Sequence, residues 1–432
     1  MKVAFQTLGC RVNVYDSEAM IEMFINDGYE LVDFNERADV YVINSCTVTN
    51  TGEKKSRQYI NRAKKTNPEA TVAVVGCYSQ VSKEEVMAIP GVDVVLGSRN
   101  KSDIVFYVHK AKAEQIQVVN VSEKLVLNSN YEDLLVTGYE EKTRAFLKIQ
   151  DGCNRFCSYC IIPYARGGLS SKNPGKVLQE INNLAQEGFK EIILSGIHIA
   201  SYGQDLPEKY DLLDLLEEIE RIDGISRVRI GSIEPMFFKG QRMERILKLK
   251  KLCPHFHLSL QSGSEKTLRR MNRRYSPEEY RDVVKILRDK IENISITTDI
   301  IVGFPGETEE EFKATYDFLE ELKLNKVHTF KYSKREGTPA FSMDNQVPSR
   351  IKDERSTIIM AQSDRFENDF IKSHRDKVKN VLFESGKNNI YMGFTPEYIR
   401  IKVESEMDLQ GRIIPTKLID IKNGLAWGEI ET

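Results

Sequence analysis

Seven cysteines are the residues of this chain whose types and spacing are best suited to chemistry. Three of them, Cys153, Cys157 and Cys160, form a C-x3-C-x2-C run. Thiolates are soft ligands that select iron–sulfur clusters or zinc. A structural zinc site usually takes four protein ligands, and no histidine or further cysteine lies close by in the sequence. A thioredoxin-like pair would leave Cys153 unexplained. The run therefore favours a four-iron cluster whose fourth iron is open to a substrate.

A second set of cysteines is widely spaced. Cys10, Cys46 and Cys77 each lie just past the C-terminal end of a predicted strand, and glycine precedes the first and the third. In open parallel sheets ligands bind outside those strand ends, so the three thiols are expected to converge at one edge. The alternative is three buried and inert thiols, because free cysteine is often buried. Cys253 belongs to neither pattern and is predicted to be a structural thiol.

The elements that must position these cysteines alternate between strands and helices in the first segment. This alternation predicts a parallel sheet in an α/β domain over residues 1–115. The expected strands are Val3–Leu8, Val40–Asn44, Val72–Val75 and Val92–Leu96, and the expected helices are Asn13–Asp27, Thr51–Lys65 and Lys83–Ile89. Residues 98–140 are less regular and are predicted to hold an edge strand and a linker.

A second series of strands and helices predicts the central domain, residues 139–370. Six such units are fewer than the eight that close a TIM barrel, so we expect an open, partial barrel with active residues at its C-terminal strand ends. After a charged helix at Lys352–Asp376, short strands in residues 371–432 predict a small antiparallel β-barrel of the OB type. The expected strands of the partial barrel are Ala145–Ile149, Glu191–Leu194, Arg227–Ile230, His257–Leu260, Ser295–Val302 and Lys326–Lys331.

The composition of the 432-residue chain sets its broad class. Apolar residues make up 41% and charged residues 29%, which excludes a disordered or collagen-like chain. No apolar run approaches the ~18 residues of a membrane helix and no signal segment is present, so a cytoplasmic location without a membrane partner is expected. The net charge is only −2, so any nucleic-acid site must be a local basic patch. Candidate phosphate contacts are Lys54, Lys55, Arg57, Arg269, Arg270, Arg273 and Arg274.

Six of the cysteines lie in motifs that resemble one enzyme family. The C-x3-C-x2-C run, with Tyr159 just before its last cysteine, resembles the radical S-adenosylmethionine enzymes. The stretches QTLGCRVN from Gln6, NSCTVT from Asn44 and VGC from Val75 resemble the three N-terminal motifs of the methylthiotransferase branch. DGC from Asp151 and PYARG from Pro163 resemble its radical-domain motif. The resemblance extends over nearly the whole chain.

The resemblance implies cofactors and partners as well as a fold. It implies two [4Fe–4S] clusters, one on each cysteine triad, with S-adenosyl-L-methionine at the open iron of the Cys153 triad. Cleavage of that molecule would give a 5′-deoxyadenosyl radical, and no side chain is assigned a catalytic role. The last strands resemble the small RNA-binding TRAM module, which implies a tRNA substrate, together with an external electron donor and sulfur source. The oligomeric state stays open. Strand-end candidates for binding the cofactor are Ser195, Gly196, Glu234, Gln261 and Ser262.

The first cysteine motif distinguishes the branches of this family. Leu8 and the pair Arg11-Val12 most resemble the branch that converts N6-threonylcarbamoyladenosine (t6A), at position 37 next to the anticodon, to its 2-methylthio derivative. The isopentenyladenosine branch tends to have Tyr and Gln-Met at these positions, and the ribosomal-protein branch tends to have Pro-Lys. Methylthiolation of isopentenyladenosine or of a ribosomal-protein aspartate is the alternative. A non-catalytic iron–sulfur RNA-binding protein is the hypothesis from another class, disfavoured because both triads lack a fourth ligand.

Overall fold

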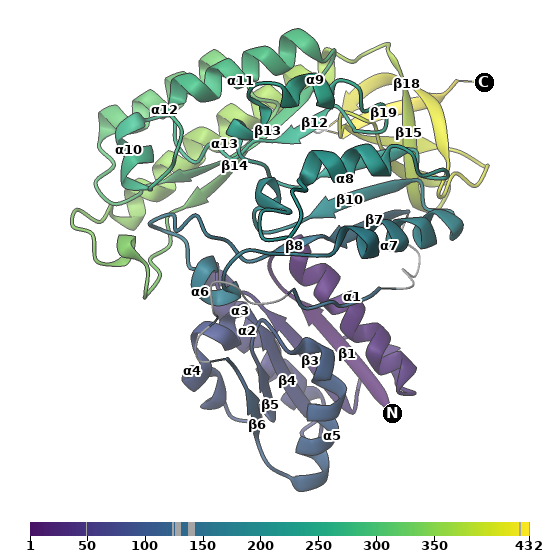
Figure 1. The fold of residues 1–432 in the computed structure, drawn as a ribbon, viewed down its shortest axis with the longest axis vertical. Coiled ribbons are helices and arrows are strands. Elements are labelled where there is room, and N and C mark those ends of the chain that lie inside the picture. The colour runs from purple at the N-terminus through teal and green to yellow at the C-terminus, as the bar shows by residue number, and fades with distance from the viewer. Residues whose placement is uncertain (49, 123–124, 126–130, 137–142, 423–424, 432) are drawn as a thin grey trace.

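A computed structural model describes residues 1–48, 50–122, 125, 131–136, 143–422 and 425–431. Three parts follow one another along the chain: a parallel sheet with helices, a partial barrel and a small closed barrel (Figure 1). The mixed α/β fold class predicted from the sequence is confirmed. Within the described residues, no helix is both long and apolar enough to span a bilayer.

The N-terminal sheet has six parallel strands in the order β2-β1-β3-β4-β5-β6. Every residue of its two central strands is buried, as expected when helices cover both faces of a parallel sheet. The strands are β1 (Lys2–Thr7), β2 (Glu30–Val32), β3 (Val40–Ser45), β4 (Thr71–Gly76), β5 (Val94–Leu96) and β6 (Val118–Asn120). The helices are α1 (Arg11–Asn26), α2 (Asn50–Thr66), α3 (Cys77–Val81), α4 (Lys83–Met87), the 3-10 turn η1 (Lys101–Asp103) and α5 (Ile104–Glu114).

The sequence prediction missed the short edge strand β2 and a helix of this domain. Residues 98–140 were expected to hold only an edge strand and a linker, but helix α5 forms at Ile104–Glu114 before the edge strand β6. Its sequence IVFYVHKAKAE begins with β-branched and aromatic residues, which carry no preference for a helix. Packing decides the outcome, because Ile104, Val108 and Ala111 are buried against the sheet.

The central part is an open barrel of two three-stranded parallel sheets, β11-β10-β7 and β12-β13-β14. Single parallel bridges between Val228 and Leu252 and between Ile233 and Leu258 connect the two sheets, whereas β7 and β14 are not paired in the described chain. Two strands of two residues each, β8 (Gln150–Asp151) and β9 (Ser170–Ser171), form an antiparallel pair after the first barrel strand. The barrel strands are β7 (Arg144–Lys148), β10 (Glu191–Ser195), β11 (Arg227–Ile230), β12 (His255–His257), β13 (Ser295–Val302) and β14 (Lys326–Lys331).

Helices cover the outside of this barrel. Two of the long ones begin with a capping box, Ser276 with Glu279 and Thr308 with Glu311, which satisfies the free amides of the first turn. The helices are α6 (Ile162–Arg166), α7 (Pro174–Gln186), α8 (Leu212–Ile219), α9 (Arg242–Ile246), α10 (Glu265–Arg270), α11 (Pro277–Lys290), α12 (Glu309–Leu322) and α13 (Ser349–Lys372). The 3-10 turns are η2 (Ile199–Ser201), η3 (Pro235–Phe238) and η4 (Pro339–Phe341).

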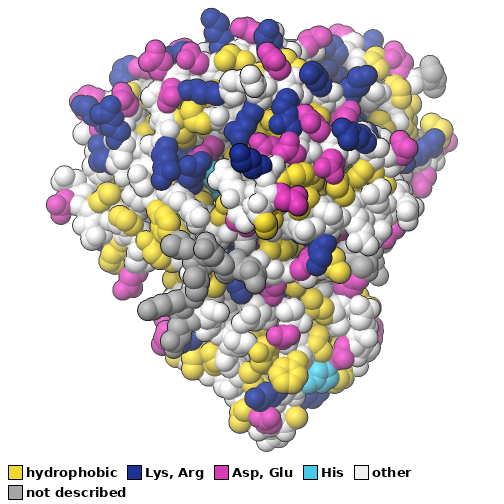
Figure 2. Space-filling model, in the orientation of Figure 1, with side chains coloured by type: hydrophobic (Ala, Val, Ile, Leu, Met, Phe, Trp, Pro, Cys, Tyr) yellow, Lys and Arg dark blue, Asp and Glu magenta, His cyan; other side chains and the backbone are white. Residues whose placement is uncertain are grey.

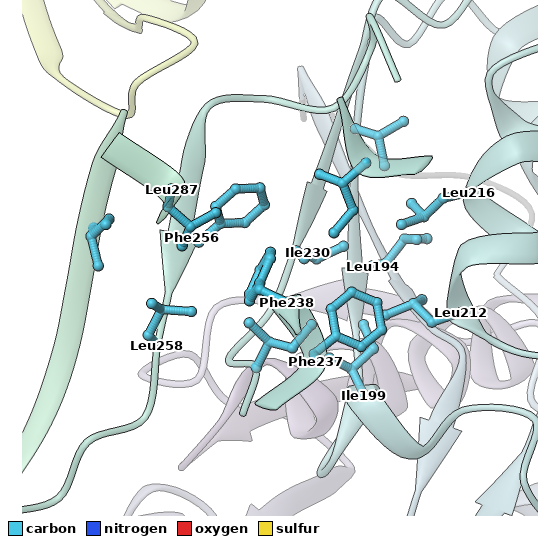
Figure 3. Packing of buried hydrophobic residues seen from close by; sticks show 14 of the residues in the cluster. Leu194, Ile199, Leu212, Leu216, Ile230, Phe237, Phe238, Phe256, Leu258 and Leu287 are labelled. Atoms are coloured by element: carbon cyan, nitrogen blue, oxygen red, sulfur yellow. The ribbon is translucent and has the colours of Figure 1, made fainter. Parts of the chain in front are cut away.

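A continuous apolar core fills the space between these helices and the barrel strands. Figure 3 shows Phe237 and Phe238 lying among Leu194 and Ile230 of the first sheet and Phe256 and Leu258 of the second, while Leu212 and Leu216 of α8 close the far side. Because this core binds the two sheets together, the C-terminal ends of all six strands are held in a fixed arrangement.

The last strands form a closed antiparallel barrel with one parallel pair, in the order β15-β16-β17-β19-β18. Two arginines of β11 fasten it to the central barrel: Arg227 donates to the Phe394 carbonyl at 3.0 Å, and Arg229 donates to the Thr395 and Pro396 carbonyls at 2.7 and 2.8 Å. The strands are β15 (Val378–Lys387), β16 (Ile390–Phe394), β17 (Arg400–Glu404), β18 (Ile413–Lys422) and β19 (Leu425–Ile430).

A buried charge cluster joins the N-terminal sheet to the central barrel. Asp16 of α1 lies 2.5 Å from Lys148 of β7, 3.0 Å from Lys101 and 3.5 Å from Arg166, and all four side chains are almost completely buried. Arg166 also donates to both carboxylate oxygens of Asp151, at 3.0 and 2.9 Å. The cluster therefore fixes α1 against the first barrel strand, β7, which it contacts (Figure 1).

Candidate functional site

The three N-terminal cysteines come together at one end of the sheet. Cys10 follows β1 by three residues, Cys46 directly follows β3, and Cys77 directly follows β4; these three strands are neighbours. The backbone of Gly9 packs so closely on Cys46 that a Cβ at Gly9 would lie 2.9 Å from the Cys46 sulfur. Only glycine fits there, because the residue also has φ of +102°. The predicted convergence of this triad is therefore what the fold produces.

The second triad lies in the loop between the β8 strand and α6. Gly152, at φ +68°, begins the loop, and a Cβ there would lie 1.8 Å from the Gly168 carbonyl oxygen. The Cys153 amide donates to the Gly167 carbonyl at 3.1 Å, which closes the loop on itself. Phe156 also has a positive φ of 49°, an uncommon conformation for a side chain of this size. The loop thus holds Cys153, Cys157 and Cys160 in a constrained turn.

The two triads face a common region at the domain interface. Helix α3, which begins with Cys77, packs against α6, which begins two residues after Cys160. Val48, two residues after Cys46, lines a cavity of about 210 Å³ together with Cys160, Gln261, Asp299 and Phe330. The cavity therefore has the Cys160 thiol of the second triad in its wall, together with a residue that follows Cys46 of the first triad.

Burial of the thiols indicates what could occupy these sites. Burial raises the pKa of Cys46 and of Cys153 to about 11, that of Cys160 to about 12, and that of Cys77 above its usual value. Neighbouring thiols of the same triad raise them further, which shows that the members of each triad lie close together. Such thiols stay protonated at neutral pH until a metal cation displaces the protons.

The triads also have a definite coordination chemistry. Among the described residues, no three His, Cys, Asp or Glu side chains are arranged to hold a single metal ion. Three thiols without a fourth protein ligand, spread more widely than around one zinc ion, fit an iron–sulfur cluster with an open iron. Backbone amides already point at two of the sulfurs: Val48 donates to Cys46 at 3.5 Å and Arg155 to Cys153 at 3.4 Å.

The predicted cofactor contacts lie at the strand ends around the second triad. They differ in whether their polar groups are already hydrogen-bonded. The hydroxyl oxygen of Ser195 is buried and has no hydrogen-bond partner among the described residues, and a Cβ at Gly196 would lie 2.8 Å from the Gln150 amide oxygen. Gln261 lines the cavity with a backbone φ of +72°. Ser262, in contrast, already contacts the Thr315 hydroxyl at 3.2 Å. Ser195 thus offers an unused polar group, whereas Ser262 does not.

Glu234 takes part in a charged network beside Cys157. It lies 2.8 Å from Arg155, 3.2 Å from His198 and 3.8 Å from Arg273. Burial opposes ionisation of Glu234, but its hydrogen bond and ion pairs with these three residues outweigh it and lower the pKa to about 2. The carboxylate is therefore ionised at neutral pH and balances the cations around the triad.

Arg273 has a different location from the other predicted phosphate contacts. Its side chain is only 7% exposed, and its guanidinium lies 3.3 Å from the Cys157 sulfur. The sequence predicts a surface patch here, because three further arginines lie close to Arg273 along the chain. The tertiary fold turns the Arg273 side chain inwards. Arg166, which lies within the radical-domain motif, was likewise not assigned a role; its positive charge acts across the domain interface on Cys77, where it opposes the rise that burial causes in the pKa of that thiol.

The remaining predicted phosphate contacts are exposed or engaged in ion pairs. Lys54 and Lys55 are exposed on α2, and Arg274 is exposed after α10. Arg57 pairs with Glu85, Arg269 with Glu265, and Arg270 with Glu311. Figure 2 shows basic and acidic side chains interspersed over the upper part of the molecule, without a large field of one sign on this face.

Sequence comparisons identify the family. Residues 147–319 match the Radical SAM superfamily, and residues 2–97 match "Uncharacterized protein family UPF0004". The chain is 42% identical to the Threonylcarbamoyladenosine tRNA methylthiotransferase MtaB of Bacillus subtilis (strain 168), over 99% of this chain and 95% of the relative. The chain belongs to the radical S-adenosylmethionine methylthiotransferases. MtaB of Aquifex aeolicus (strain VF5) is 40% identical, over 96% of this chain and 99% of the relative.

The name of a further relative specifies a different substrate. The tRNA-2-methylthio-N(6)-dimethylallyladenosine synthase of Clostridium botulinum (strain Loch Maree / Type A3) is 35% identical, over 98% of this chain and 96% of the relative. Among solved structures, the radical S-adenosylmethionine methyltransferase TsrM of Kitasatospora setae shares the fold, with a TM-score of 0.56 at 15% identity over 79% of this chain and 75% of TsrM.

Family membership establishes the class of activity and the cofactors. This methylthiotransferase is a transferase that uses S-adenosylmethionine and [4Fe–4S] clusters, of which members of the family carry two. The two thiol triads match that number.

Proposed function

We propose that this methylthiotransferase converts t6A at position 37 of tRNA to its 2-methylthio derivative. The observation that carries the proposal is the packing of α3, which begins with Cys77, against α6, which begins just after Cys160, so that the two three-thiol sets lie at one domain interface. The reaction needs this proximity, because a hydrogen has to be removed and a sulfur delivered at the same carbon. The choice of t6A is supported by the greater identity to the two relatives named for it, 42% and 40%, than to the relative named for dimethylallyladenosine, 35%.

The residues of the chain divide the work between the two triads. Cys153, Cys157 and Cys160 would hold the cluster that binds S-adenosylmethionine, and Cys10, Cys46 and Cys77 would hold the cluster that carries the sulfur. When bound, these groups supply the one-electron chemistry that can activate an aromatic C–H bond. The protein orients these groups and excludes water. The Ser195 hydroxyl, the backbone at Gly196 and the Gln261 side chain in the cavity wall would bind the cofactor.

Charged side chains around the thiols set the electrostatics. Arg273 would donate to the Cys157 sulfur, and Arg166 to the Cys77 sulfur, so each triad has one buried guanidinium that favours the ionised sulfur. Glu234 and Asp151 neutralise these arginines and keep them in place.

The tRNA contacts belong to the same proposal. Lys54, Lys55 and Arg274 are exposed and would neutralise phosphates, with Arg57, Arg269 and Arg270 available where they exchange a carboxylate for a phosphate. The closed C-terminal barrel would act as a TRAM module that binds RNA. An external electron donor and sulfur source complete the reaction, and the cytoplasm supplies both.

Dimethylallyladenosine, the isopentenyl-type substrate, is the second candidate, because a relative named for it is 35% identical over 98% of this chain. Mass spectrometry of tRNA nucleosides from cells lacking this protein distinguishes the two. Loss of 2-methylthio-t6A, restored by the wild-type gene and not by a Cys157→Ala gene, supports the proposal. Normal 2-methylthio-t6A in the deletion strain, in a cell without a second such enzyme, would refute it. Loss of the 2-methylthio isopentenyl nucleoside instead would move the assignment to the second candidate.

A further inference from the structure

The open side of the partial barrel lies next to the N-terminal triad. Strands β7 and β14 are unpaired there in the described chain, and α1 packs against β7 (Figure 1). Arg11 is the first residue of α1 and directly follows Cys10, which is itself exposed. Arg11 therefore lies beside the N-terminal triad.

Arg11 is exposed, and two aromatic groups determine where its side chain lies. Its guanidinium lies 5.3 Å from the centre of the Phe146 ring on β7, and it donates to the Tyr398 hydroxyl of the C-terminal barrel at 3.3 Å. An arginine stacked on an aromatic ring keeps its hydrogen-bonding edge free for a planar anion. Arg11 thereby contacts the central barrel at β7 and the C-terminal barrel at Tyr398, and so connects all three parts of the chain.

The charges around Tyr398 are unevenly balanced. Arg144 pairs with Glu384 at 2.7 Å, and Arg229 pairs with Glu191 at 2.9 Å, so both of these cations have a carboxylate. In the described part of the chain, no carboxylate forms an ion pair with Arg11. Arg11 is thus the cation of this cluster that still lacks a counter-charge.

Neighbouring groups also favour an anion. Burial tends to raise the pKa of Tyr398, but Arg11, Arg144 and Arg229 outweigh it and lower the pKa below its usual value. The His255 ring stacks on Tyr398 with centroids 4.8 Å apart, and its buried Nδ1 atom has no hydrogen-bond partner. An anion entering here would meet a positive field and unused polar groups.

We propose that Arg11 is the residue that determines substrate specificity, by binding the carboxylate of the threonylcarbamoyl group. This inference rests on the proposed function. That carboxylate is the only anionic group on the t6A base, and the isopentenyl substituent has none. A guanidinium binds a carboxylate through two parallel hydrogen bonds, which a glutamine or a lysine cannot reproduce.

The test measures binding as well as turnover. Anticodon stem-loop RNAs carrying t6A, its neutral methyl ester, or isopentenyladenosine at position 37 are titrated into cluster-loaded wild type, Arg11→Gln, Arg11→Lys and the control Arg37→Gln. Arg37 is an exposed arginine before β3, at the opposite end of the sheet from Cys10. Iron content and the visible spectrum of each variant are measured first, so that loss of the adjacent cluster is detected.

We expect wild type and Arg37→Gln to bind the t6A RNA about 10- to 100-fold more tightly than its methyl ester, the range of a charge-assisted bidentate pair. Arg11→Gln should bind both equally, and Arg11→Lys should keep only part of the preference. A full preference in iron-replete Arg11→Gln would overturn this inference alone. Equal affinity of wild type for t6A and isopentenyladenosine RNA, with turnover of the latter, would overturn the proposed function. If Arg11→Gln loses iron, iron-replete Arg11→Lys provides the test instead. An unchanged preference of Arg11→Lys for the t6A RNA over its methyl ester refutes the role of the guanidinium, and a reduced preference supports it.

Discussion

Replacing Asp16 with asparagine should loosen the joint between the N-terminal sheet and the central barrel. Asp16 is completely buried and lies within 3.5 Å of three cations, Lys101, Lys148 and Arg166. Asparagine keeps the shape and one oxygen acceptor but removes the charge. The three cations are then balanced only by Asp151 and by the more distant Glu132.

The magnitude follows in two ways. Burial raises the pKa of Asp16, but Lys101, Lys148 and Arg166 outweigh it, so the pKa falls from 3.8 to about 2. At about 1.4 kcal/mol per pKa unit, that difference is about 2–3 kcal/mol of stability. Removing one partner of a buried ion pair costs about 3–5 kcal/mol. Both numbers are a large part of the roughly 5–15 kcal/mol that holds a domain together.

Hydrogen exchange of the α1 and β7 amides measures this loss at the interface itself. A loss of about 3 kcal/mol lowers their protection factors about 100-fold. The control is Glu30→Gln, whose exposed ion pair with Lys2 at 3.9 Å should change protection less than about fivefold. If Asp16→Asn lowers the protection factors no more than Glu30→Gln does, the reasoning is refuted.

The sign of the pH dependence is fixed by the lowered pKa. Because the folded carboxyl group has a lower pKa than the unfolded one, its stabilisation is complete above about pH 4 and is lost as the pH falls through about 2. The difference in melting temperature between wild type and Asp16→Asn should therefore be constant near neutral pH and shrink only in strong acid.

Three further predictions concern the loop, the RNA surface and the seventh cysteine. Gly152→Ala would drive a Cβ into the Gly168 carbonyl, so it should lose the iron of the second triad, about half the total. The matched control Gly188→Ala has the same kind of backbone strain, at φ +93°, but faces open space, and it should keep all iron in a ferrozine assay. Lys387→Ala and Arg400→Ala, exposed on the C-terminal barrel, should each weaken tRNA binding and reduce the salt slope by about one; an unchanged slope would exclude them as phosphate contacts. Cys253→Ala should keep full iron, because this buried thiol belongs to neither triad, and loss of a cluster would make it a ligand.

Much of the architecture follows from sequence patterns because they are local and strong. The buried strands β3 and β4 are continuous apolar runs, and each is followed at once by its cysteine, so both the sheet and its reactive edge were predictable. Helix α5 was missed because its first residues, which are β-branched and aromatic, favour a strand, and packing against the sheet overrides that preference.

The parts of the site that were not predicted depend on contacts distant in the sequence. Arg273 meets Cys157 over 116 residues, and Arg166 meets Asn13 over 153, so no spacing rule could reveal them. His198 lies 3.2 Å from Glu234 because two strand ends meet in the fold, and no motif in the sequence links the two residues. Motifs indicated the candidate metal ligands, whereas the charged groups around them became evident only in the fold.

The central claim is that the two cysteine triads have separate functions, and one paired measurement tests it. Cys46→Ala and Cys157→Ala are reconstituted anaerobically, and iron, release of 5′-deoxyadenosine and methylthiolated RNA are measured on each. Each variant should lose about half of the iron. Cys157→Ala should produce neither 5′-deoxyadenosine nor product, whereas Cys46→Ala should still release 5′-deoxyadenosine but form no methylthio product. Full iron and full methylthiolation in Cys46→Ala would contradict the account, because the N-terminal cysteines would then be structural.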